Sequence, residues 1–368
     1  MDIVDTFFSP SFGNRPSQLV GRDATIRHII DGLASQPGSK ERATLILGQR
    51  GSGKTVLLWE LADQARKQGF VVATPTVVSE SMLNRVIEKI QDDGDRYIKS
   101  GRGKLTGGSL GALGFSVGLQ FESSIQETKS FGYKMLKLGQ RLGEQGHGIL
   151  ILVDEVQAQS VELKELISTY LELVGEQQNV AIVLAGLPGA ISSVLNNRVL
   201  TFLNRARKIT LEPLAMGDVD AFYAHAFKQL GIQINSDLRR KASSATEGSP
   251  YLLQLLGHNI VQYADEHGNV NEAALDEAIE SSRIAFEEEV CATTIAALSE
   301  KDVDFLRAMS HDNDESSLAD IAERMGVTAD YAQKYRKRLI DSGVICASKR
   351  GHVAFAVPYV ADYLRNQE

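Results

Sequence analysis

The chain has 368 residues, of which 43% are hydrophobic and 23% are charged, and its formal net charge at pH 7 is −8. This length predicts two or three domains, and the composition is ordinary for a globular protein. The negative charge argues against a protein that coats nucleic acid, although it leaves room for a local basic patch, and the longest aliphatic run, Ile149–Val153, is too short to span a bilayer.

Short aliphatic runs alternate with amphipathic helical stretches over the first two-thirds of the chain. The runs lack period-two alternation, which is typical of strands that are buried on both faces of a parallel sheet. We therefore predict an α/β fold with helices on both faces of this sheet. Its predicted strands are Thr44–Leu47, Phe70–Ala73, Ile149–Val153, Val180–Ala185 and Arg207–Leu211.

The most informative motif lies between the first predicted strand and the helix after it. The sequence LILGQRGSGKT (45–55) has the form G-x-x-x-x-G-K-[ST] and lies between an apolar strand and a helical pattern, the context that a phosphate-binding loop requires. Glycine N–H groups and the helix N-terminus would hold phosphates, Lys54 would reach the β- and γ-phosphates, and Thr55 would bind Mg²⁺. The predicted nucleotide-binding residues of the loop are Gly48, Gln49, Gly51, Ser52, Gly53, Lys54 and Thr55.

A glycine-rich segment, residues 100–123, interrupts the alternation between the second and third strands. Its second half alternates apolar residues with glycine and polar residues, which predicts a half-buried strand in a hairpin insertion whose tip holds Arg102 and Lys104. Two interpretations stay open: a hairpin packed on the edge of the core, or an element that contacts a partner or DNA.

The third strand ends in two carboxylates, in the run GILILVDEVQ (148–157). An acidic residue at the carboxyl end of a strand near the phosphate loop can hold Mg²⁺, and the next carboxylate can orient or deprotonate the attacking water. We assign Asp154 to the metal and Glu155 to the general base.

Beyond Met216 the pattern becomes helical. Two of the expected helices, Asp218–Gly231 and Ser249–Gly268, end in a glycine that can cap them. A third unit begins near Leu298, in which SLADIAERMGVTADYAQKYRKRLIDSGVI (317–345) predicts two helices joined by a turn, as in a helix-turn-helix. Ile345–Ala347 and Val353–Val357 are expected to pair around SKRGH as a wing.

The phosphate loop, the acidic pair and the order of the elements resemble the AAA+ ATPases, in the branch of the origin-recognition initiators and the archaeal-type and STAND ATPases. The resemblance covers nearly the whole chain. It implies a nucleotide-binding core (1–214, with the hairpin at 100–123), an all-helical lid (215–295) and a C-terminal winged helix (296–368).

The resemblance also implies roles for residues outside the phosphate loop. RPSQLVGRDATIRHIIDGL (15–33) is similar to the segment that covers adenine in the family, at Val20, Gly21 and Arg22. RARKITLEPL (205–214) resembles the last core strand and the segment before it, where an arginine can act on a neighbouring subunit's nucleotide. Arg205 is the candidate for this catalytic arginine, and Arg198 and Arg207 are its rivals.

Two departures from the family put fast hydrolysis in doubt. The fourth strand ends at Gly186, where many relatives place a polar residue that touches the γ-phosphate. The lid reads TEGSPYLLQLLG (246–257), with Gly248 and Pro250 at the start of the helix where many relatives have an arginine that reaches the phosphates. Because Pro250 occupies this position, it is a candidate nucleotide contact. We expect slow or assembly-dependent hydrolysis of ATP to ADP and phosphate.

The second helix of the C-terminal unit has two faces. At 100° per residue, Tyr331, Tyr335 and Leu339 share the face expected to pack on the core. Cations lie on the opposite face of this helix, on its flanks and at the tip of the wing, and they form a candidate DNA-binding surface. These residues are Lys334, Lys337, Arg338, Lys349 and Arg350, with Gln333 and Arg336 beside them. A protein-binding surface and a merely solvated face are the alternatives.

Three functions remain open. The first is an ATP/ADP- and Mg²⁺-dependent switch that binds double-stranded DNA. The second is a STAND-like signalling ATPase whose winged helix is a latch on a protein surface. The third is a scaffold that binds nucleotide without hydrolysis.

A homo-oligomer or a protein partner is expected, and binding to a membrane is not. The acidic N-terminus does not resemble a signal peptide, and Cys291 and Cys346 read as buried or neutral thiols, so we expect a cytoplasmic protein.

Overall fold

The computed structural model describes residues 5–11, 15–100, 129–197 and 200–367. The predictions for the hairpin of residues 100–123, with Arg102 and Lys104, therefore lie outside the described residues apart from Ser100, the last residue of a helix.

The core is built on a five-stranded parallel sheet with the order β2-β3-β4-β1-β5, as predicted. Each predicted strand is present within a few residues of its expected bounds. The second runs four residues further, and its register shifts between Ala73 and Thr76, where Pro75 offers no N–H to a neighbouring strand. The strands are β1 (Ala43–Leu47), β2 (Phe70–Val77), β3 (Gly148–Asp154), β4 (Val180–Gly186) and β5 (Arg207–Thr210).

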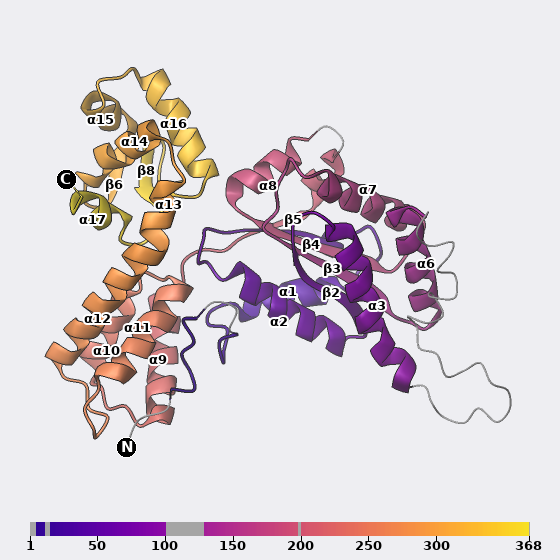
Figure 1. Ribbon diagram of the computed structural model, residues 1–368, viewed down its shortest axis with the longest axis horizontal. Coiled ribbons are helices and arrows are strands. Elements are labelled where there is room, and N and C mark those ends of the chain that lie inside the picture. Colours follow the sequence, from indigo (N-terminus) through magenta and orange to yellow (C-terminus); the bar gives the residue numbers. More distant parts are fainter. Residues whose placement is uncertain (1–4, 12–14, 101–128, 198–199, 368) are drawn as a thin grey trace.

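Helices cover both faces of this sheet (Figure 1). Successive strand residues point to opposite faces: Leu45 packs into one hydrophobic cluster and Ile46 into the other. The Ile46 face is covered by α1 (Asp23–Gly32) and α2 (Lys54–Lys67). The Leu45 face is covered by α3 (Met82–Ser100), α6 (Phe131–Glu144), α7 (Val161–Gly175) and α8 (Pro188–Leu195). Short 3-10 turns, η1 (Lys40–Arg42) and η2 (Thr201–Arg205), precede β1 and β5.

The lid is helical, as predicted, and has its own hydrophobic cluster, which includes Phe8 from the N-terminal segment. Its helices are α9 (Met216–Leu230), α10 (Ser236–Ala245), α11 (Pro250–Tyr263) and α12 (Glu272–Phe286). Gly231 caps α9 in the left-handed conformation, as predicted. The expected cap at Gly268 is wrong, because α11 ends at Tyr263 where Ala264 turns to extended backbone, and Gly268 lies in the following turn.

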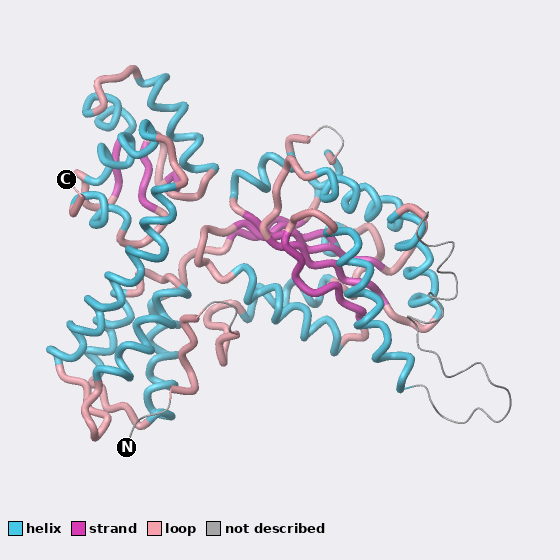
Figure 2. Tube along the Cα trace, viewed as in Figure 1, coloured by secondary structure: helices cyan, strands magenta, loops and turns pink. Residues whose placement is uncertain are grey.

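A π-helical turn, η3 (Glu287–Cys291), and α13 (Ala292–Ala296) continue α12 toward the C-terminal unit, which we define as residues 299–367 (Figure 2). Its antiparallel sheet has the order β6-β8-β7, and β6 is a strand that the sequence analysis missed. The elements are α14 (Glu300–Ser310), β6 (Glu315–Ser317), α15 (Leu318–Arg324), α16 (Ala329–Asp341), β7 (Ile345–Ala347), β8 (His352–Phe355) and α17 (Val360–Arg365).

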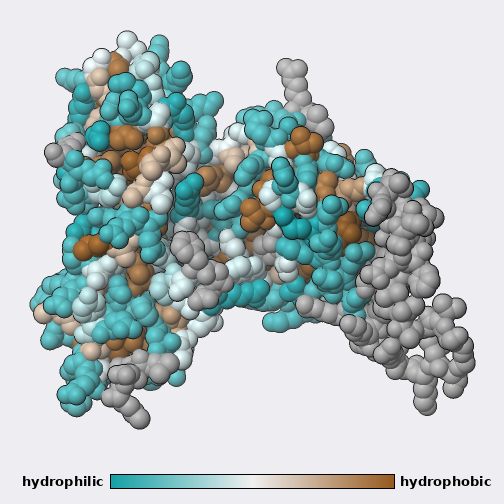
Figure 3. Space-filling model, viewed as in Figure 1, coloured by the Kyte–Doolittle hydropathy of each residue, from teal (hydrophilic) through white to brown (hydrophobic). Residues whose placement is uncertain are grey.

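Hydrophilic residues cover most of the face of the molecule drawn in Figure 3, and hydrophobic residues form small separate patches. In the part of the chain that the structure describes, every helix is too short or too polar to cross a membrane.

Candidate nucleotide-binding site

The phosphate-binding loop connects β1 to α2 at the carboxyl edge of the sheet. Gly51 and Gly53 adopt φ of +74° and +84°, a region that favours glycine because a Cβ would be strained there. The hydroxyl of Ser52 is buried and has no hydrogen-bond partner among the described residues. A buried polar group of this kind in a loop of N–H donors fits a phosphate ligand.

Lys54 is held inside this loop. Its Nζ donates to the carbonyl oxygens of Gly48 at 2.9 Å and Gln49 at 2.6 Å. Burial lowers the pKa of Lys54 to about 8, an effect that the nearby carboxylates of Asp154 and Glu155 partly oppose and that Arg50 reinforces. The ammonium group has three N–H donors, so one remains available to a phosphate while these two bonds persist.

Thr55 and Asp154 meet although they are 99 residues apart in the chain. The Thr55 hydroxyl donates to Asp154 Oδ2 at 2.5 Å, and the Asp154 side chain is buried, with 3% of the residue exposed. A hydroxyl and a carboxylate are hard oxygen ligands of the kind that Mg²⁺ prefers, completed by water and phosphate oxygens. These two side chains therefore fit the predicted metal.

Glu155 follows Asp154 directly and is exposed. Its φ of +50° lies in the left-handed region, and its N–H donates to Asp154 Oδ1 at 2.8 Å. A non-glycine residue in this conformation is strained, which is frequent at functional sites. The turn holds the Asp154 carboxylate toward Thr55 and leaves the Glu155 side chain free to meet water.

The lid helix α11 faces the loop with its N-terminus. A Cβ on Gly53 would lie 3.8 Å from Pro250 Cγ, and a Cβ on Gly51 would lie 3.8 Å from Tyr251 Cβ. The hydroxyl of Ser249 caps the helix by accepting from the N–H of Leu252. The structure thus brings Pro250 to the predicted phosphate site.

The N-terminal segment predicted to cover adenine lies at the junction of core and lid. The buried guanidinium of Arg22 donates to the carbonyl of Glu212 at 2.7 Å, and burial lowers its pKa. Val20 packs against the hydrophobic cluster of the lid, and Gly21 lies against Leu214 and Asp218. Arg22 therefore positions the segment, and a direct contact of Val20 or Arg22 with adenine stays a prediction.

The three candidate arginines have different surroundings. Arg205 is exposed at the end of η2 and makes no ion pair within the described residues. Arg207 is engaged inside the molecule, since it donates to the carbonyl of His28 at 2.8 Å and lies 3.7 Å from Glu41. Arg198 lies outside the described residues. Of the two described arginines, Arg205 is the one available to a neighbouring molecule.

The departures seen in the sequence are also visible in the site. Gly186, the last residue of β4, pairs with Leu47 beside the phosphate loop, and a Cβ there would lie 3.2 Å from Val156. At the start of the lid helix, Gly248 has φ of +71° and a Cβ would lie 2.7 Å from the carbonyl oxygen of Leu214. Neither position offers a polar side chain to a γ-phosphate.

The candidate DNA-binding cations divide into two groups. Lys334 and Lys337 are exposed on α16 and Arg350 on the β7–β8 turn, and all three make no ion pair in the described chain. Arg338, in contrast, pairs with Asp302 and lies over the Tyr335 ring, and Lys349 pairs with Glu315.

Two expectations about the C-terminal unit need correction, one about its candidate DNA-binding cations and one about the buried face of α16. Arg338 and Lys349 balance carboxylates of their own unit, so they are not the free cations that the sequence pattern indicated. Tyr335 and Leu339 are buried as expected, but Tyr331 is 40% exposed and lies at the lining of a hollow beside α14. The Tyr331 hydroxyl accepts a hydrogen bond from Tyr335 at 2.7 Å.

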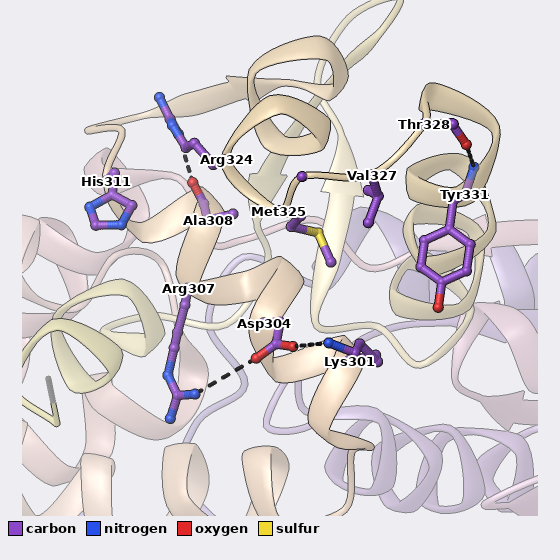
Figure 4. Close-up of a pocket in the computed structure, with 11 residues that line it drawn as sticks. Lys301, Asp304, Arg307, Ala308, His311, Arg324, Met325, Val327, Thr328 and Tyr331 are labelled. Carbon is purple, nitrogen blue, oxygen red and sulfur yellow. Dashed lines mark hydrogen bonds and ion pairs between the residues drawn. The ribbon is translucent and has the colours of Figure 1, made fainter.

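The C-terminal unit also contains a hollow of about 650 Å³ between α14 and the α15–α16 turn (Figure 4). Its cations are matched by carboxylates: Lys301 and Arg307 pair with Asp304, and Arg324 pairs with Asp312. Each of these cations thus has a carboxylate partner, whereas the Lys54 ammonium of the phosphate loop donates to carbonyl oxygens and makes no ion pair among the described residues.

Sequence reasoning missed a contact between the C-terminal unit and the core. Gly189 in α8 lies against the backbone of Asp341, the last residue of α16. Gly343, two residues later, lies against the Gln49 side chain in the phosphate loop. Nothing in the sequence pairs these residues, because they are far apart in the chain.

Two family models match the chain: an AAA ATPase domain over residues 18–184, and a domain of unknown function, DUF8462, over residues 288–364. No curated protein matches it. The Walker-type ATPase PABY2304 of Pyrococcus abyssi has a similar structure, with a TM-score of 0.69 at 16% identity, covering 95% of this chain and 97% of that one.

The ORC2 protein of Aeropyrum pernix is also similar in two structures. In its ADPNP-ADP complexes the TM-score is 0.62 at 15% identity, covering 97% of this chain and 96% of that one. In its ADP form the TM-score is 0.54 at 14% identity, covering 97% of both chains. Identities this low establish the fold alone, while the family model spans the phosphate loop and Asp154. Residues 18–184 therefore match the AAA ATPase domain, and the chain has the mostly parallel sheet and the helical units of these similar structures.

Proposed function

We propose that this ATPase is a molecular switch that couples its nucleotide state to the binding of double-stranded DNA through a C-terminal winged helix. The order α14, β6, α15, α16, β7, β8, with a three-stranded antiparallel sheet, supports the proposal of a winged helix. In this arrangement α16 is the helix that enters a major groove, and the β7–β8 turn is the wing.

One observation carries the proposal: Lys334 and Lys337 are exposed on α16, with Arg350 on the wing, and none of the three makes an ion pair within the described residues. Cations that balance no carboxylate are available to phosphates or to guanine edges. The paired residues Arg338 and Lys349 have a smaller part, because each would leave a carboxylate of its own unit to reach DNA.

The test is fluorescence anisotropy of a labelled duplex with ATP and Mg²⁺, with ADP and without nucleotide, at two salt concentrations. We expect the affinity to depend on nucleotide and to weaken with salt. Lys334→Glu/Lys337→Glu should reduce the affinity at least about tenfold and lower the salt slope by roughly one per lysine.

The matched control is Lys67→Glu/Lys228→Glu, which makes the same change of net charge at exposed lysines of α2 and α9. Its affinity for the duplex should stay near that of the wild type. Equal losses in both double variants would show that only the overall charge matters, and the proposal for α16 would be wrong.

The catalytic part of the proposal is slow hydrolysis in which Lys54 and Thr55 hold the phosphates and Mg²⁺, Asp154 holds the metal, and Glu155 activates water. Bound Mg²⁺ would neutralise charge on the transferred phosphoryl group. Gly186 and Pro250 offer no polar contact to the γ-phosphate, which supports a low rate in the isolated chain. Single-turnover hydrolysis by Glu155→Gln should be at least about a hundredfold slower than by the wild type; equal rates would favour a scaffold that only binds nucleotide.

We propose functional boundaries at 1–214, 215–295 and 296–368, a homo-oligomer in which Arg205 reaches a neighbour's nucleotide, and a cytoplasmic setting. The ORC2 protein of similar fold was solved with ADPNP and ADP, which supports ATP and ADP as the ligands here. Arg205→Ala should slow hydrolysis only under conditions in which the protein associates.

A second candidate function is a STAND-like signalling ATPase, and the packing of α16 against α8 favours it. In this function the C-terminal unit is a latch on the core and meets a protein instead of DNA. Absence of duplex binding in every nucleotide state, together with nucleotide-dependent release of the unit from α8, would establish this alternative.

A further inference from the structure

Arg50 is a cation of the phosphate-binding loop to which the proposed function gives no part. It is exposed, and its guanidinium makes no hydrogen bond or ion pair among the described residues. Its backbone nitrogen belongs to the same planar peptide group as the Gln49 carbonyl, which accepts from the Lys54 ammonium at 2.6 Å. The side chain of Arg50 therefore begins close to this ammonium. The charge of Arg50 also adds to the effect of burial in lowering the pKa of Lys54.

The backbone of Arg50 lies between the two positions at which the site lacks a polar contact to a γ-phosphate. On one side of it, the N–H of Gly48 donates to the carbonyl of Gly186, the last residue of β4, at 3.2 Å. On the other side, a Cβ on Gly51 would lie 3.8 Å from Tyr251 Cβ, in the first turn of α11. The loop thus carries Arg50 between the end of β4 and the start of the lid helix.

The chemistry of the site leaves a place for a second cation. Two N–H groups of Lys54 donate to the carbonyls of Gly48 and Gln49, which leaves one for a phosphate. The γ-phosphoryl group spreads negative charge over three oxygens in the transition state of its transfer. A guanidinium offers five N–H donors in a planar fork, which can bind two such oxygens at once.

We propose that Arg50 is a catalytic residue that binds the γ-phosphate of the ATP held by its own chain. In the hydrolysis step, the water oxygen forms a bond to the γ-phosphorus and a water proton passes to Glu155. The bond from this phosphorus to the bridging oxygen breaks, and its electron pair stays on ADP. The Arg50 guanidinium donates to the γ-phosphoryl oxygens during this step, and so supplies a polar contact that Gly186 and Pro250 do not offer. The inference rests on the ATP hydrolysis of the proposed function, and DNA has no part in it.

The first test compares Arg50→Ala with the wild type in single-turnover hydrolysis of ATP and in the Kd of ADP. We expect the rate constant to fall about a hundredfold, the usual effect of removing one donor to a developing charge. The Kd of ADP should change less than about threefold, because ADP has no γ-phosphate. An unchanged rate, or a loss of ADP affinity as large as the loss of rate, would overturn the proposal.

A second test separates a direct contact from a structural effect on the loop. Aluminium fluoride with ADP imitates the phosphoryl group in transfer, so Arg50→Ala should bind this complex more weakly by about the factor by which its rate falls. Millimolar guanidinium chloride should restore part of the rate of Arg50→Ala and leave the wild type unchanged. If the variant binds the aluminium fluoride complex as tightly as the wild type and guanidinium restores nothing, the proposal is wrong.

Arg141→Ala is the matched control, since it removes the same charge and side chain elsewhere in the core. Arg141 lies in the last turn of α6, is partly exposed and makes no ion pair in the described chain. The strand β3 begins just after this helix, so Arg141 lies near the edge of the sheet opposite to the phosphate loop. Its rate and its Kd of ADP should equal those of the wild type. A loss of rate equal to that of Arg50→Ala would assign the effect to net charge and overturn the proposal.

The protein concentration distinguishes Arg50 from Arg205. A residue that acts on the nucleotide of its own chain contributes equally below and above the concentration at which the protein associates. Arg50→Ala should therefore lower the rate by the same factor at both concentrations, whereas Arg205→Ala should lower it only at the higher one. If Arg50→Ala lowers the rate only at the higher concentration, Arg50 acts on a neighbour and its assignment here is wrong.

The results also separate this inference from the proposed function. If the wild type does not bind ADP, the nucleotide site itself is wrong. If it binds ADP but neither hydrolyses ATP nor binds ADP more tightly with aluminium fluoride, the catalytic part of the proposed function is wrong, and the role of Arg50 with it. If the wild type hydrolyses ATP and Arg50→Ala does so equally fast, only the role of Arg50 is wrong.

Discussion

Asp302 shows how a buried carboxylate restricts the residues around it. Its side chain is 4% exposed, accepts from the N–H and hydroxyl of Ser299 in a capping box, and pairs with Arg338. A buried charge that loses its partner is costly. The role of Arg338 in the described structure is therefore to stabilise the start of α14, and any loss of DNA binding on its removal has to be corrected for lost stability.

Arg338→Ala should lower the free energy of unfolding by about 1–3 kcal/mol, because Arg338 is half exposed and water replaces part of the interaction. Urea denaturation followed by circular dichroism measures it. Lys334→Ala, on the same helix but without an ion pair in the part of the chain that the structure describes, should change stability by less than about 0.5 kcal/mol. If the two substitutions lower the free energy of unfolding equally, the pair of Arg338 with Asp302 is not the cause.

Asp312 gives a pH dependence of stability whose sign can be worked out. The hydrogen bonds from Arg324 lower the pKa of Asp312 to about 2, below its usual value of 3.8. A lowered pKa means that the ionised carboxylate stabilises the folded state above pH 4, and that this contribution is lost as the pH falls from about 4 toward 2. Because both side chains are partly exposed, the contribution is modest.

Asp312→Asn should therefore lower the melting temperature at pH 6 and flatten its decline between pH 4 and pH 2.5. Thermal denaturation over this range is the measurement. Asp314→Asn, an exposed carboxylate two residues away without an ion pair in the described chain, should leave the profile of the wild type. A decline of the same steepness in Asp312→Asn would contradict the role of this pair.

At the scale of single elements, local signals in the sequence predict most of the structure. The first four strands follow from aliphatic runs, and the end of α9 follows from Gly231. The end of α11 does not, because Ala264 leaves the helix without any residue that marks the position. The three-residue strand β6 is missed for a similar reason: it is polar, and only pairing with β8 makes it a strand.

The nucleotide site was predicted more fully than the C-terminal surface, for a physical reason. Phosphate loops need glycines, lysine and a hydroxyl at fixed spacing, so their chemistry is local in the sequence. The pairing of Arg338 with Asp302 and of Lys349 with Glu315 depends on the tertiary fold. Helical periodicity predicts which side of α16 a residue occupies, but not whether a neighbouring helix already neutralises it.

The N-terminal cap of α11 lies close to the candidate nucleotide site, so its loss should affect both stability and nucleotide binding. Ser249→Ala removes the N-cap of this helix and should cost about 1 kcal/mol of stability. It should also weaken nucleotide binding, because Pro250 and Tyr251 in the first turn lie against the loop glycines. Ser317→Ala removes the equivalent cap of α15 and should lower stability without altering the nucleotide Kd. If the two variants have equal nucleotide Kd values, the cap of α11 does not influence nucleotide binding.

At the scale of the whole molecule, the lid and the C-terminal unit are joined more firmly than the C-terminal unit and the core. The Tyr359 hydroxyl donates to the carbonyl of Ala245 at 2.5 Å, and the Tyr359 ring packs on Phe286. The contact with the core at α8 and the phosphate loop involves the end of α16 and the turn after it. We therefore expect the lid and the C-terminal unit to move together when the contact at α8 opens.

If the proposed function is right and the contact at α8 restricts access of DNA to α16, Gly189→Ala should bind duplex DNA more tightly than the wild type in the absence of nucleotide. The reason is that a Cβ at residue 189 conflicts with the backbone of Asp341, so the substitution separates the C-terminal end of α16 from α8 without any ligand. Anisotropy titrations of wild type, Gly189→Ala and the control Gly217→Ala, whose new Cβ would meet nothing within 4 Å, each with and without ATP and Mg²⁺, measure this. Linkage supplies a strict check: the factor by which nucleotide strengthens DNA binding must equal the factor by which DNA strengthens nucleotide binding. A Gly189→Ala variant that binds DNA as the wild type does but still responds fully to nucleotide would show that the switch acts elsewhere than at α8.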